Sequence, residues 1–465
     1  MPAFDSCHLA RWTAGRWTAK PGSPVTGFGI DTRQLRPGDV FVALRTERRD
    51  GHDFLAAAAQ QGAAAALVAR PVPEVLLPQL VVADPLRAFQ AIAREHRLAF
   101  PGPVIGITGS AGKTSTKHLL ALLLGPATLA TEGNLNNHLG VPLTLTRLDP
   151  LLHRFAVVEA GISEPGEMAV LAQMIEPDLA IVTLVAPAHT EALGGLEGVA
   201  REKAVLAAAV RASGRAYFPE SVAAFEPFRR LPAGRLLAVP AARVDTPAAA
   251  DHVVFTVEQR ATATRLRLRI GAEPVMQFQL PRVSAGMAQN AVLALAVARG
   301  LGVSEAALQE RLAAWSPPAL RGEIRRTPGQ LLYLDCYNAN PASMQDALAA
   351  FQELAPPGEP RLLVLGGMEE LGADSRARHE ELGRALRLQP ADHVCVIGPE
   401  ADAVRRGALA AGARPDQVEI CSTLAPIADR LSGFRGAVFV KGSRKYRLEE
   451  ILVGTPAAGS TLGRH

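Results

Sequence analysis

The sequence has 465 residues, of which 48% are hydrophobic and 20% are charged. This balance is typical of a globular protein with ample material for buried cores, so it excludes an intrinsically disordered chain. The length predicts two to four domains, and we take three as the working number. The 49 basic and 45 acidic residues leave a formal net charge of only +4, which does not indicate a nucleic-acid-binding protein.

The cysteines and the N-terminal segment bear on the compartment in which the protein works. Four cysteines lie far apart in the sequence: Cys7, Cys336, Cys395 and Cys421. Because they form no CxxC pair, they argue against a structural zinc and against a disulfide scaffold. The N-terminus has no basic segment followed by an apolar one, and the Ala-rich stretch 56–68 is too short to span a bilayer. We therefore expect a cytoplasmic protein without membrane insertion.

Pro/Gly-marked junctions at 100–103 and 316–318 divide the chain into three predicted domains, 1–100, 101–316 and 317–465. The first domain holds short strand candidates, including 39–44, and one Ala-rich helix after His52. In the second, apolar runs at 104–108, 155–159 and 179–185 alternate with helix-length amphipathic segments, which predicts a parallel α/β sheet. Runs at 361–365, 393–397 and 437–440 repeat this rhythm and predict a second, smaller α/β domain.

The segment GITGSAGKTSTK, residues 106–117, follows an apolar strand candidate and leads into a helix-like run. This order is typical of a phosphate-binding loop, in which backbone N–H groups surround phosphates at a helix N-terminus. Lys113 would reach the β and γ phosphate oxygens, and Thr114 would offer its hydroxyl to Mg²⁺. Ile107 stands where strict Walker A spacing has glycine, so the loop is a close variant. A plain glycine-rich turn is the alternative. The predicted nucleotide contacts are Gly109, Ser110, Ala111, Gly112, Lys113, Thr114 and Ser115.

The segment TGSAGKTST resembles the phosphate loop of the Mur ligase and folylpolyglutamate synthase family. Further segments resemble the Mur ligases that add D-alanyl-D-alanine: DTRQLRPGDVFVAL and DGHDF near the N-terminus, TEGNLNNHLGVP at 131–142, LDCYNANPASM at 334–344, and VKGSRKYRLE near the C-terminus. They occur in the family's order, so the resemblance covers nearly the whole chain. It implies an N-terminal substrate-binding α/β domain, a central P-loop ATPase-like domain with a parallel sheet, and a C-terminal Rossmann-like α/β domain.

The resemblance also implies an activity. An ATP-dependent ligase would join D-alanyl-D-alanine to UDP-N-acetylmuramoyl-tripeptide through an acyl phosphate, in peptidoglycan synthesis, and we expect it to act as a monomer. Another Mur ligase or a folylpolyglutamate-synthase-type amide ligase is the nearest alternative. A nucleotide-binding paralogue that has lost ligation is an alternative of a different class.

The chemistry of amide formation explains which residue types are needed. A carboxylate is a poor electrophile, so ATP must first convert it into an acyl phosphate, and catalysis then rests on cations and positioning. Glu159 ends an apolar strand, where its carboxylate can hold Mg²⁺ together with Thr114. The resemblance adds His189 as a second metal ligand and Lys203 as a carbamylated lysine. Taken alone, these residues read as a solvated loop glutamate, a surface histidine and a solvated lysine. The predicted catalytic residues are Lys113, Glu159, His189 and Lys203.

Three residues are predicted to complete the ATP site. Asn290, at the start of a long Ala/Leu helix, resembles the family asparagine that reads adenine, but Ser284-Ala-Gly286 stands where relatives usually have Gly-x-His. Arg321 suits a phosphate contact, and its alternative is an exposed linker arginine. Asp335, at the end of an apolar strand, suits the ribose hydroxyls.

The substrate contacts implied by the resemblance lie on turns. Lys441, Ser443 and Arg444 form a cationic turn that domain closure would bring toward the acyl phosphate, and a plain surface turn is the alternative. Thr46 and Gly367 replace a usual glycine and a common aspartate, and His379 lies close in sequence to Gly367. The predicted substrate contacts are Asp31, Thr32, Arg33, Asp50, His52, Asn134, Asn137, Tyr337, Asn338, Lys441 and Arg444.

Overall fold

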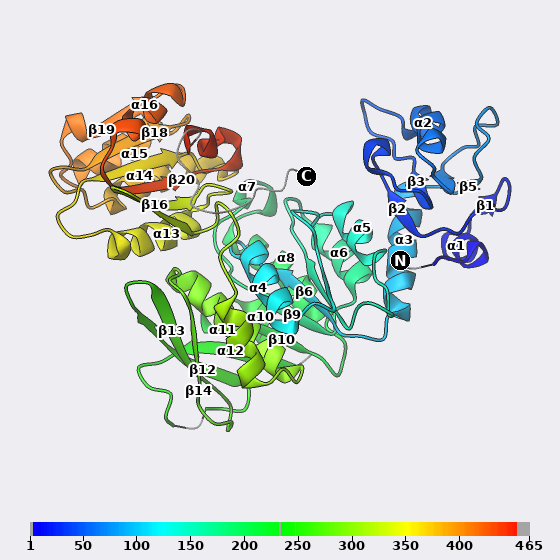
Figure 1. Cartoon of the computed structure of the whole chain (residues 1–465), viewed down its shortest axis with the longest axis horizontal. Coiled ribbons are helices and arrows are strands. Elements are labelled where there is room, and N and C mark those ends of the chain that lie inside the picture. Colours follow the sequence, from blue (N-terminus) through cyan, green and yellow to red (C-terminus); the bar gives the residue numbers. More distant parts are fainter. Residues whose placement is uncertain (1–2, 232–233, 247, 453–465) are drawn as a thin grey trace.

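The structure is a computed structural model and describes residues 3–231, 234–246 and 248–452. Three sheets follow one another along the chain, with strands inside residues 16–81, 104–281 and 323–441. The N-terminal part (blue) and the C-terminal part (yellow to red) lie on opposite sides of the view, each against the central part (Figure 1). The predicted succession of three α/β units is confirmed, while the boundaries at 100 and 316 stay a prediction.

The N-terminal sheet has the strand order β1-β5-β4-β3-β2. Its strands are β1 (Arg16–Trp17), β2 (Gly27–Gly29), β3 (Asp39–Val42), β4 (Ala65–Val68) and β5 (Gln79–Val81), and its helices are α1 (Ser6–Thr13), α2 (Leu55–Gln60) and α3 (Pro85–Ala99). All neighbours are parallel except β1 and β5. The strand predicted at 39–44 is β3, and the Ala-rich helix after His52 is α2. Phe89 of α3 is fully buried beneath this sheet, among Val40, Val42 and Leu67.

The central sheet has nine strands in the order β14-β13-β12-β11-β10-β9-β6-β8-β7. These are β6 (Val104–Thr108), β7 (Thr128–Ala130), β8 (Phe155–Glu159), β9 (Leu179–Val182), β10 (Arg215–Pro219), β11 (Gly234–Pro240), β12 (His252–Gln259), β13 (Ala263–Ile270) and β14 (Met276–Pro281). Strand β6 pairs in parallel with both β8 and β9. The loop after β6 therefore emerges between the carboxyl ends of two neighbours, where ligands bind in such sheets.

The central sheet is parallel from β7 to β12, as predicted, and two further strands that the sequence did not indicate extend it in antiparallel order. Strand β13 runs antiparallel to both of its neighbours, β12 and β14. Burial alternates along β13 and β14, so one face of this part packs on the core and the other meets solvent. The continuous apolar runs, which are the clearest strand signal in the sequence, belong only to the parallel part of the sheet.

Helices cover both faces of the central sheet. They are α4 (Lys113–Leu124), α5 (Gly140–Leu145), α6 (Glu167–Ile175), α7 (Thr190–Leu193), α8 (Leu196–Ala208), α9 (Glu220–Ala223), α10 (Glu226–Arg229), α11 (Ala285–Gly300) and α12 (Glu305–Ala313). Helices α4 and α11 share one hydrophobic core and α6 and α8 share another. The phosphate-loop helix is thus packed directly against the helix that carries Asn290.

The C-terminal sheet has the order β15-β16-β20-β17-β18-β19. Its elements are β15 (Glu323–Thr327), β16 (Gln330–Asp335), α13 (Pro341–Leu354), β17 (Arg361–Gly366), α14 (Ser375–Ala385), β18 (His393–Ile397), α15 (Ala401–Ala410), β19 (Val418–Cys421), α16 (Ala425–Gly433) and β20 (Gly436–Lys441). Only β15 is antiparallel to its neighbour. Short 3-10 turns complete the chain: η1 (Thr32–Gln34), η2 (Gly51–Phe54), η3 (Gly372–Asp374), η4 (Pro415–Gln417), η5 (Arg444–Tyr446) and η6 (Leu448–Leu452). Within the described ranges, no helix is long and apolar enough to cross a membrane.

Candidate active site

The phosphate loop joins β6 to α4 as predicted. Two of its glycines have positive φ, +148° at Gly109 and +78° at Gly112. A Cβ at Gly109 would lie 1.8 Å from Thr183 Oγ1, and one at Gly112 would lie 2.3 Å from Asn290 Nδ2. Glycine is therefore required at both positions for conformation and for space. Lys113 Nζ donates to the Gly109 carbonyl at 2.8 Å, which curls the lysine back over its own loop.

Glu159 is the centre of a buried polar group at the carboxyl end of β8. Its Oε1 accepts from Asn136 Nδ2 at 2.8 Å and from Thr114 Oγ1 at 3.2 Å. Its Oε2 lies 3.3 Å from Lys117 Nζ, and both side chains are almost fully buried. Burial raises the pKa of Glu159, but the ammonium groups of Lys117 and Lys113 outweigh it and lower the pKa overall. Glu159 is thus held as a carboxylate beside the phosphate loop.

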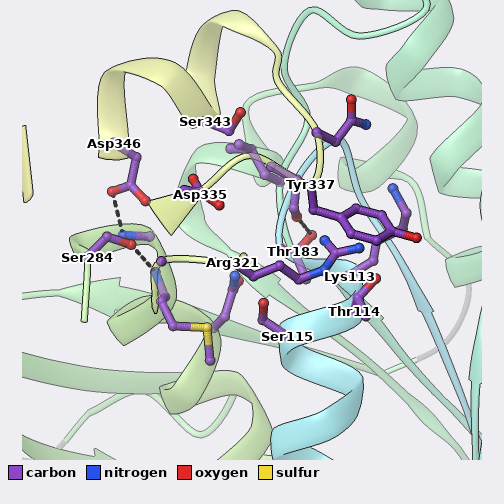
Figure 2. Close-up of a pocket in the computed structure, with 18 of the residues that line it drawn as sticks. Lys113, Thr114, Ser115, Thr183, Ser284, Arg321, Asp335, Tyr337, Ser343 and Asp346 are labelled. Carbon is purple, nitrogen blue, oxygen red and sulfur yellow. Dashed lines mark hydrogen bonds between the residues drawn. The ribbon is translucent and has the colours of Figure 1, made fainter. Parts of the chain in front are cut away.

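A cavity of about 410 Å³ opens above the phosphate loop, between the central and C-terminal parts of the chain (Figure 2). From the central part, Ser110 to Ser115, Glu159, Thr183 and the start of α11 line it. From the C-terminal part, the segment after β16 and the first turns of α13 line it. The predicted residues brought together here are Ser110, Ala111, Gly112, Lys113, Thr114, Ser115, Asn134, Glu159, Asn290, Arg321, Asp335, Tyr337, Asn338 and Lys441.

Asn340 ties the C-terminal part to the phosphate loop. Its Nδ2 donates to the Ser110 carbonyl at 2.9 Å, while its Oδ1 accepts from Ser343 N and caps α13. Pro341 follows at the first helical position, where its fixed φ favours the helix start. The NANP sequence thus both starts a helix and contacts the nucleotide loop.

Arg321 lies against the ring of Tyr337, with Cζ 3.9 Å from the ring centroid (Figure 2). Such stacking stabilises a guanidinium at the edge of a site. The charge of Arg321 also contributes to the lowered pKa values of Lys113, Lys117 and Glu159. Arg321 lines the same cavity as the phosphate loop and is half-buried rather than exposed, while a phosphate contact by it stays a prediction.

Lys441 ends β20 and is buried, with its ammonium engaged inside the C-terminal part. Nζ lies 2.5 Å from Asp335 Oδ2 and 3.2 Å from the Asn338 carbonyl. Burial raises the pKa of Asp335, although Lys441 counteracts this. Lys441 therefore fixes the strand end that carries Asp335. Arg444 lies farther out, half-exposed and paired with Glu449, with Cζ 5.9 Å from the Tyr337 ring.

His189 and Lys203 lie outside the lining of the cavity but close to Lys113. His189 pairs with Glu370 of the C-terminal part. Burial lowers the pKa of Lys203 well below its ordinary value, and the charge of Lys113 lowers it further. The burial of Lys203 excludes the alternative of a solvated surface lysine and shifts the amine toward its neutral form.

Two neighbouring asparagines have different surroundings, and of the two only Asn137 was predicted to contact substrate. Asn137 does not line the cavity, because its Oδ1 accepts from the backbone N–H groups of Leu139 and Gly140 and forms the turn before α5. Asn136 instead points at Glu159. Asparagine often forms such turns with its own backbone, and the sequence does not show which of adjacent asparagines does so.

The N-terminal turns are built as capping structures. Asp31 Oδ1 accepts from Arg33 N at 3.0 Å, and the Arg33 side chain, with this bond, lowers the pKa of Asp31 to about 2. Thr32 begins η1 between them. Asp50 binds both the backbone and ring of His52, whose other ring nitrogen accepts from Ala69 N at 3.0 Å. These bonds define local turns, and substrate contact by them stays a prediction.

A second cavity, of about 330 Å³, lies beside these turns in the N-terminal part. Its charged lining residues are three arginines and three acidic residues: Arg45, Glu47, Arg48, Arg49, Asp50 and Asp53. In the sequence these arginines belong to the charged run RTERRD. That run was not used to predict a site. Because the three positive and three negative side chains balance, the lining gives no preference for an anionic ligand.

The space around position 367 is too small for a residue larger than glycine. A Cβ there would lie 2.7 Å from Tyr446 Oη, and this hydroxyl donates to Glu369 at 2.6 Å. His379 is buried beneath the same segment, where its Nε2 accepts from Met368 N at 2.9 Å. His379 therefore supports the 367–370 loop from inside.

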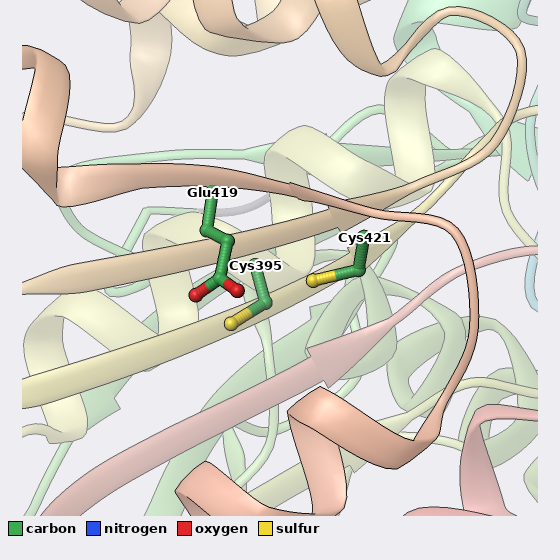
Figure 3. A group of neighbouring side chains, drawn as sticks. All are labelled: Cys395, Glu419 and Cys421. Atoms are coloured by element: carbon green, nitrogen blue, oxygen red, sulfur yellow. The ribbon is translucent and has the colours of Figure 1, made fainter.

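Cys395, Glu419 and Cys421 form a separate group on β18 and β19, with the spacing of a metal site (Figure 3). Burial raises the pKa of Cys395 to about 12 and also raises the pKa of Cys421, so both stay thiols. Glu419 is paired with Arg430 at 2.7 Å. Both cysteines belong to the hydrophobic core on one face of the C-terminal sheet, where they pack as small apolar residues.

Comparison with known proteins agrees with this site. Three family models match in order: Mur ligase family, catalytic domain (24–97), Mur ligase middle domain (107–298), and Mur ligase, glutamate ligase domain (320–444). The UDP-N-acetylmuramoyl-tripeptide–D-alanyl-D-alanine ligase of Escherichia coli is 35% identical over 91% of this chain and 92% of its own.

Solved structures show the same arrangement. A MurF structure from Acinetobacter baumannii matches with a TM-score of 0.84 and 28% identity, over 97% of this chain and 98% of its own. MurF ligase from Thermotoga maritima in complex with ADP matches with a TM-score of 0.78 and 27% identity, over 92% and 96%.

The fold and the site together define an ATP-dependent ligase of three α/β domains, in which the phosphate loop faces the C-terminal domain across the cavity. The chain belongs to the Mur ligase family.

Proposed function

We propose that this chain joins D-alanyl-D-alanine to UDP-N-acetylmuramoyl-tripeptide at the expense of ATP, as a step of peptidoglycan synthesis. The observation that carries the proposal is the cavity in which Lys113, Thr114 and Glu159 face Arg321 across two domains. Relatives that bear this activity in their names match over nine-tenths of the chain or more. We also propose the division 1–100 for the nucleotide-sugar substrate, 101–316 for ATP and 317–465 for the closing ligase domain.

The reaction has two steps. A carboxylate oxygen of the tripeptide attacks the γ-phosphorus of ATP, the bond to ADP breaks, and an acyl phosphate forms. The dipeptide amine then adds to the acyl carbon, inorganic phosphate leaves, and the amine loses a proton. Both steps bring anions together, so Lys113 and Arg321 serve by neutralising charge and holding the phosphates in line.

The residues around Glu159 fit Mg²⁺. Among the described residues, Glu159 Oε2 accepts no hydrogen bond and has only its ion pair with Lys117, and the Thr114 hydroxyl lies beside the other oxygen. Both are hard oxygen ligands of the kind that Mg²⁺ prefers. Bound there with ATP, Mg²⁺ would offset charge on the β and γ phosphates. A second ion at His189 stays a prediction, because that imidazole is paired with Glu370.

Carbamylation of Lys203 is a prediction of the sequence resemblance alone. None of the compared proteins supports it. Burial and Lys113 do favour a neutral amine at this position, and a neutral amine is the form that adds CO₂. A cytoplasmic location and a monomeric state likewise stay predictions.

The proposed function is tested by product formation from purified protein. With ATP, Mg²⁺, UDP-N-acetylmuramoyl-tripeptide and D-alanyl-D-alanine, mass spectrometry should find the pentapeptide product together with ADP and phosphate. Leaving out either peptide substrate should stop phosphate release. If phosphate release is unchanged without the dipeptide, the chain is a nucleotidase or another ligase. If glutamate replaces the dipeptide, the folylpolyglutamate-synthase-type alternative is correct.

A further inference from the structure

The end of the cavity opposite the phosphate loop is formed by two helix starts. Ser284, the N-cap residue of α11, and Ser343 and Asp346 of α13 line it (Figure 2), together with Gly286 and Met287 of α11. Asn290, one turn after Gly286 and on the same side of α11, reaches the phosphate loop at Gly112. A nucleotide whose phosphates occupy the loop therefore directs its nucleoside along α11 toward this end.

Asp346 crosses the domain boundary to reach this end. Its Oδ1 accepts from Gly286 N at 2.9 Å, so it helps Ser284 to cap α11. A Cβ at Gly286 would come within 2.7 Å of Asp346 Oδ2. The Asp346 carboxylate thus occupies the space that a side chain at position 286 would need. Because residue 286 is glycine, the carboxylate can approach the start of α11.

The second oxygen of Asp346 is free to bind a ligand. Over the described residues, Oδ2 makes no hydrogen bond and the carboxylate makes no ion pair. The charge of Asp346 contributes to the raised pKa values of Tyr333 and Asp335, which places it on their side of the cavity. A carboxylate only accepts hydrogen bonds and repels phosphate, so the group that it faces is an uncharged donor.

We propose that Asp346 selects the nucleobase of ATP by accepting a hydrogen bond from the exocyclic 6-amino group of adenine through Oδ2. The inference rests on the proposed use of ATP by this site and adds to it a residue that sets base specificity. A 6-oxo purine presents an acceptor at the same position and is disfavoured, because two acceptors face each other there.

The direct test is Asp346→Asn, with the affinities for ATP and inosine triphosphate measured by calorimetry in the presence of Mg²⁺. Because the Gly286 N–H needs an acceptor, the amide keeps its oxygen on that side and turns its NH₂ toward the base. The wild type should prefer ATP by about tenfold or more, and the variant should lose at least about tenfold of that ratio. An unchanged ratio, with both affinities lowered together, would reduce Asp346 to a helix cap and overturn the proposal.

Asp346→Ala gives a second test, with purine riboside triphosphate, which lacks the 6-amino group. The wild type should prefer ATP over this analogue, and the variant should bind both equally. If the variant instead loses discrimination against 2′-deoxy-ATP, the contact is to ribose and the base assignment is wrong. Glu353→Gln is the matched control, since Glu353 lies on the same helix and binds Arg282 across the same boundary, outside the cavity. It should leave all ratios unchanged.

These measurements need neither peptide substrate. A protein that shows the expected ratios but forms no product refutes the proposed function and leaves the role of Asp346 intact. A protein that forms product with unchanged ratios refutes only the role of Asp346.

Discussion

Lys117 and Glu159 form a deeply buried ion pair below the phosphate loop. Removing one partner leaves an uncompensated buried charge, which typically costs about 3–5 kcal/mol. We expect Lys117→Met to lower the free energy of unfolding by about that amount, measured by urea denaturation at neutral pH.

The matching control is the double variant Lys117→Met/Glu159→Gln. Because it removes both charges, it should be more stable than Lys117→Met alone, although Glu159→Gln is expected to abolish ligation. If the losses of unfolding free energy in the two single variants simply add up in the double variant, the two side chains are not coupled.

Lys203 offers a second test at the scale of one residue. If its carbamate supplies an oxygen ligand, Lys203→Ala should lose nearly all ligation and recover part of it when short carboxylates such as acetate are added. Lys445→Ala, at an exposed lysine, should need no rescue. A variant that folds and binds ATP with Mg²⁺ but shows no rescue would contradict the carbamate.

Residues on strand ends could be predicted from the sequence, while their partners could not. Glu159 follows a fully buried apolar run, and parallel order places such a residue beside the phosphate loop. Lys117, Asn136 and Asp346 carry no comparable signal, because their roles depend on which side chain meets them from another element.

The phosphate loop can be tested as an element by two glycine substitutions. Gly112→Ala places a Cβ 2.3 Å from Asn290 Nδ2 at positive φ, so the loop must shift, and ATP affinity should fall by about 100-fold. Gly302→Ala also has positive φ but meets nothing within 4 Å. It should cost about 1–2 kcal/mol of stability and leave ATP affinity unchanged. Equal effects on ATP affinity would mean that backbone strain alone explains the loss.

Among the elements, buried parallel strands and long helices were predictable, and the antiparallel extension was not. The strands at 104–108, 155–159 and 393–397 match prediction in both bounds. Strands β12 to β14 carry arginine and glutamine on their solvent face, so their apolar residues alternate and form no continuous run. A search for continuous runs therefore misses them.

At the scale of the whole molecule, the site exists only because two domains meet. Asn340 binds Ser110, Asp346 binds Gly286, and Glu353 binds Arg282 across this boundary. The sequence motifs identified residues on each side of this domain boundary. The sequence does not show which surfaces of the two domains pack together. The N-terminal domain, with its own cavity, stands apart from this contact (Figure 1).

The central claim is that this three-domain arrangement activates a carboxylate by phosphorylation. It is tested most directly with UDP-N-acetylmuramoyl-tripeptide labelled with ¹⁸O in its terminal carboxylate, with the released phosphate analysed by ³¹P NMR. Since the acyl phosphate keeps one carboxylate oxygen on phosphorus, each phosphate formed during ligation should carry one ¹⁸O. Phosphate released during ligation without any ¹⁸O would show that its oxygen came from water, and would contradict the mechanism.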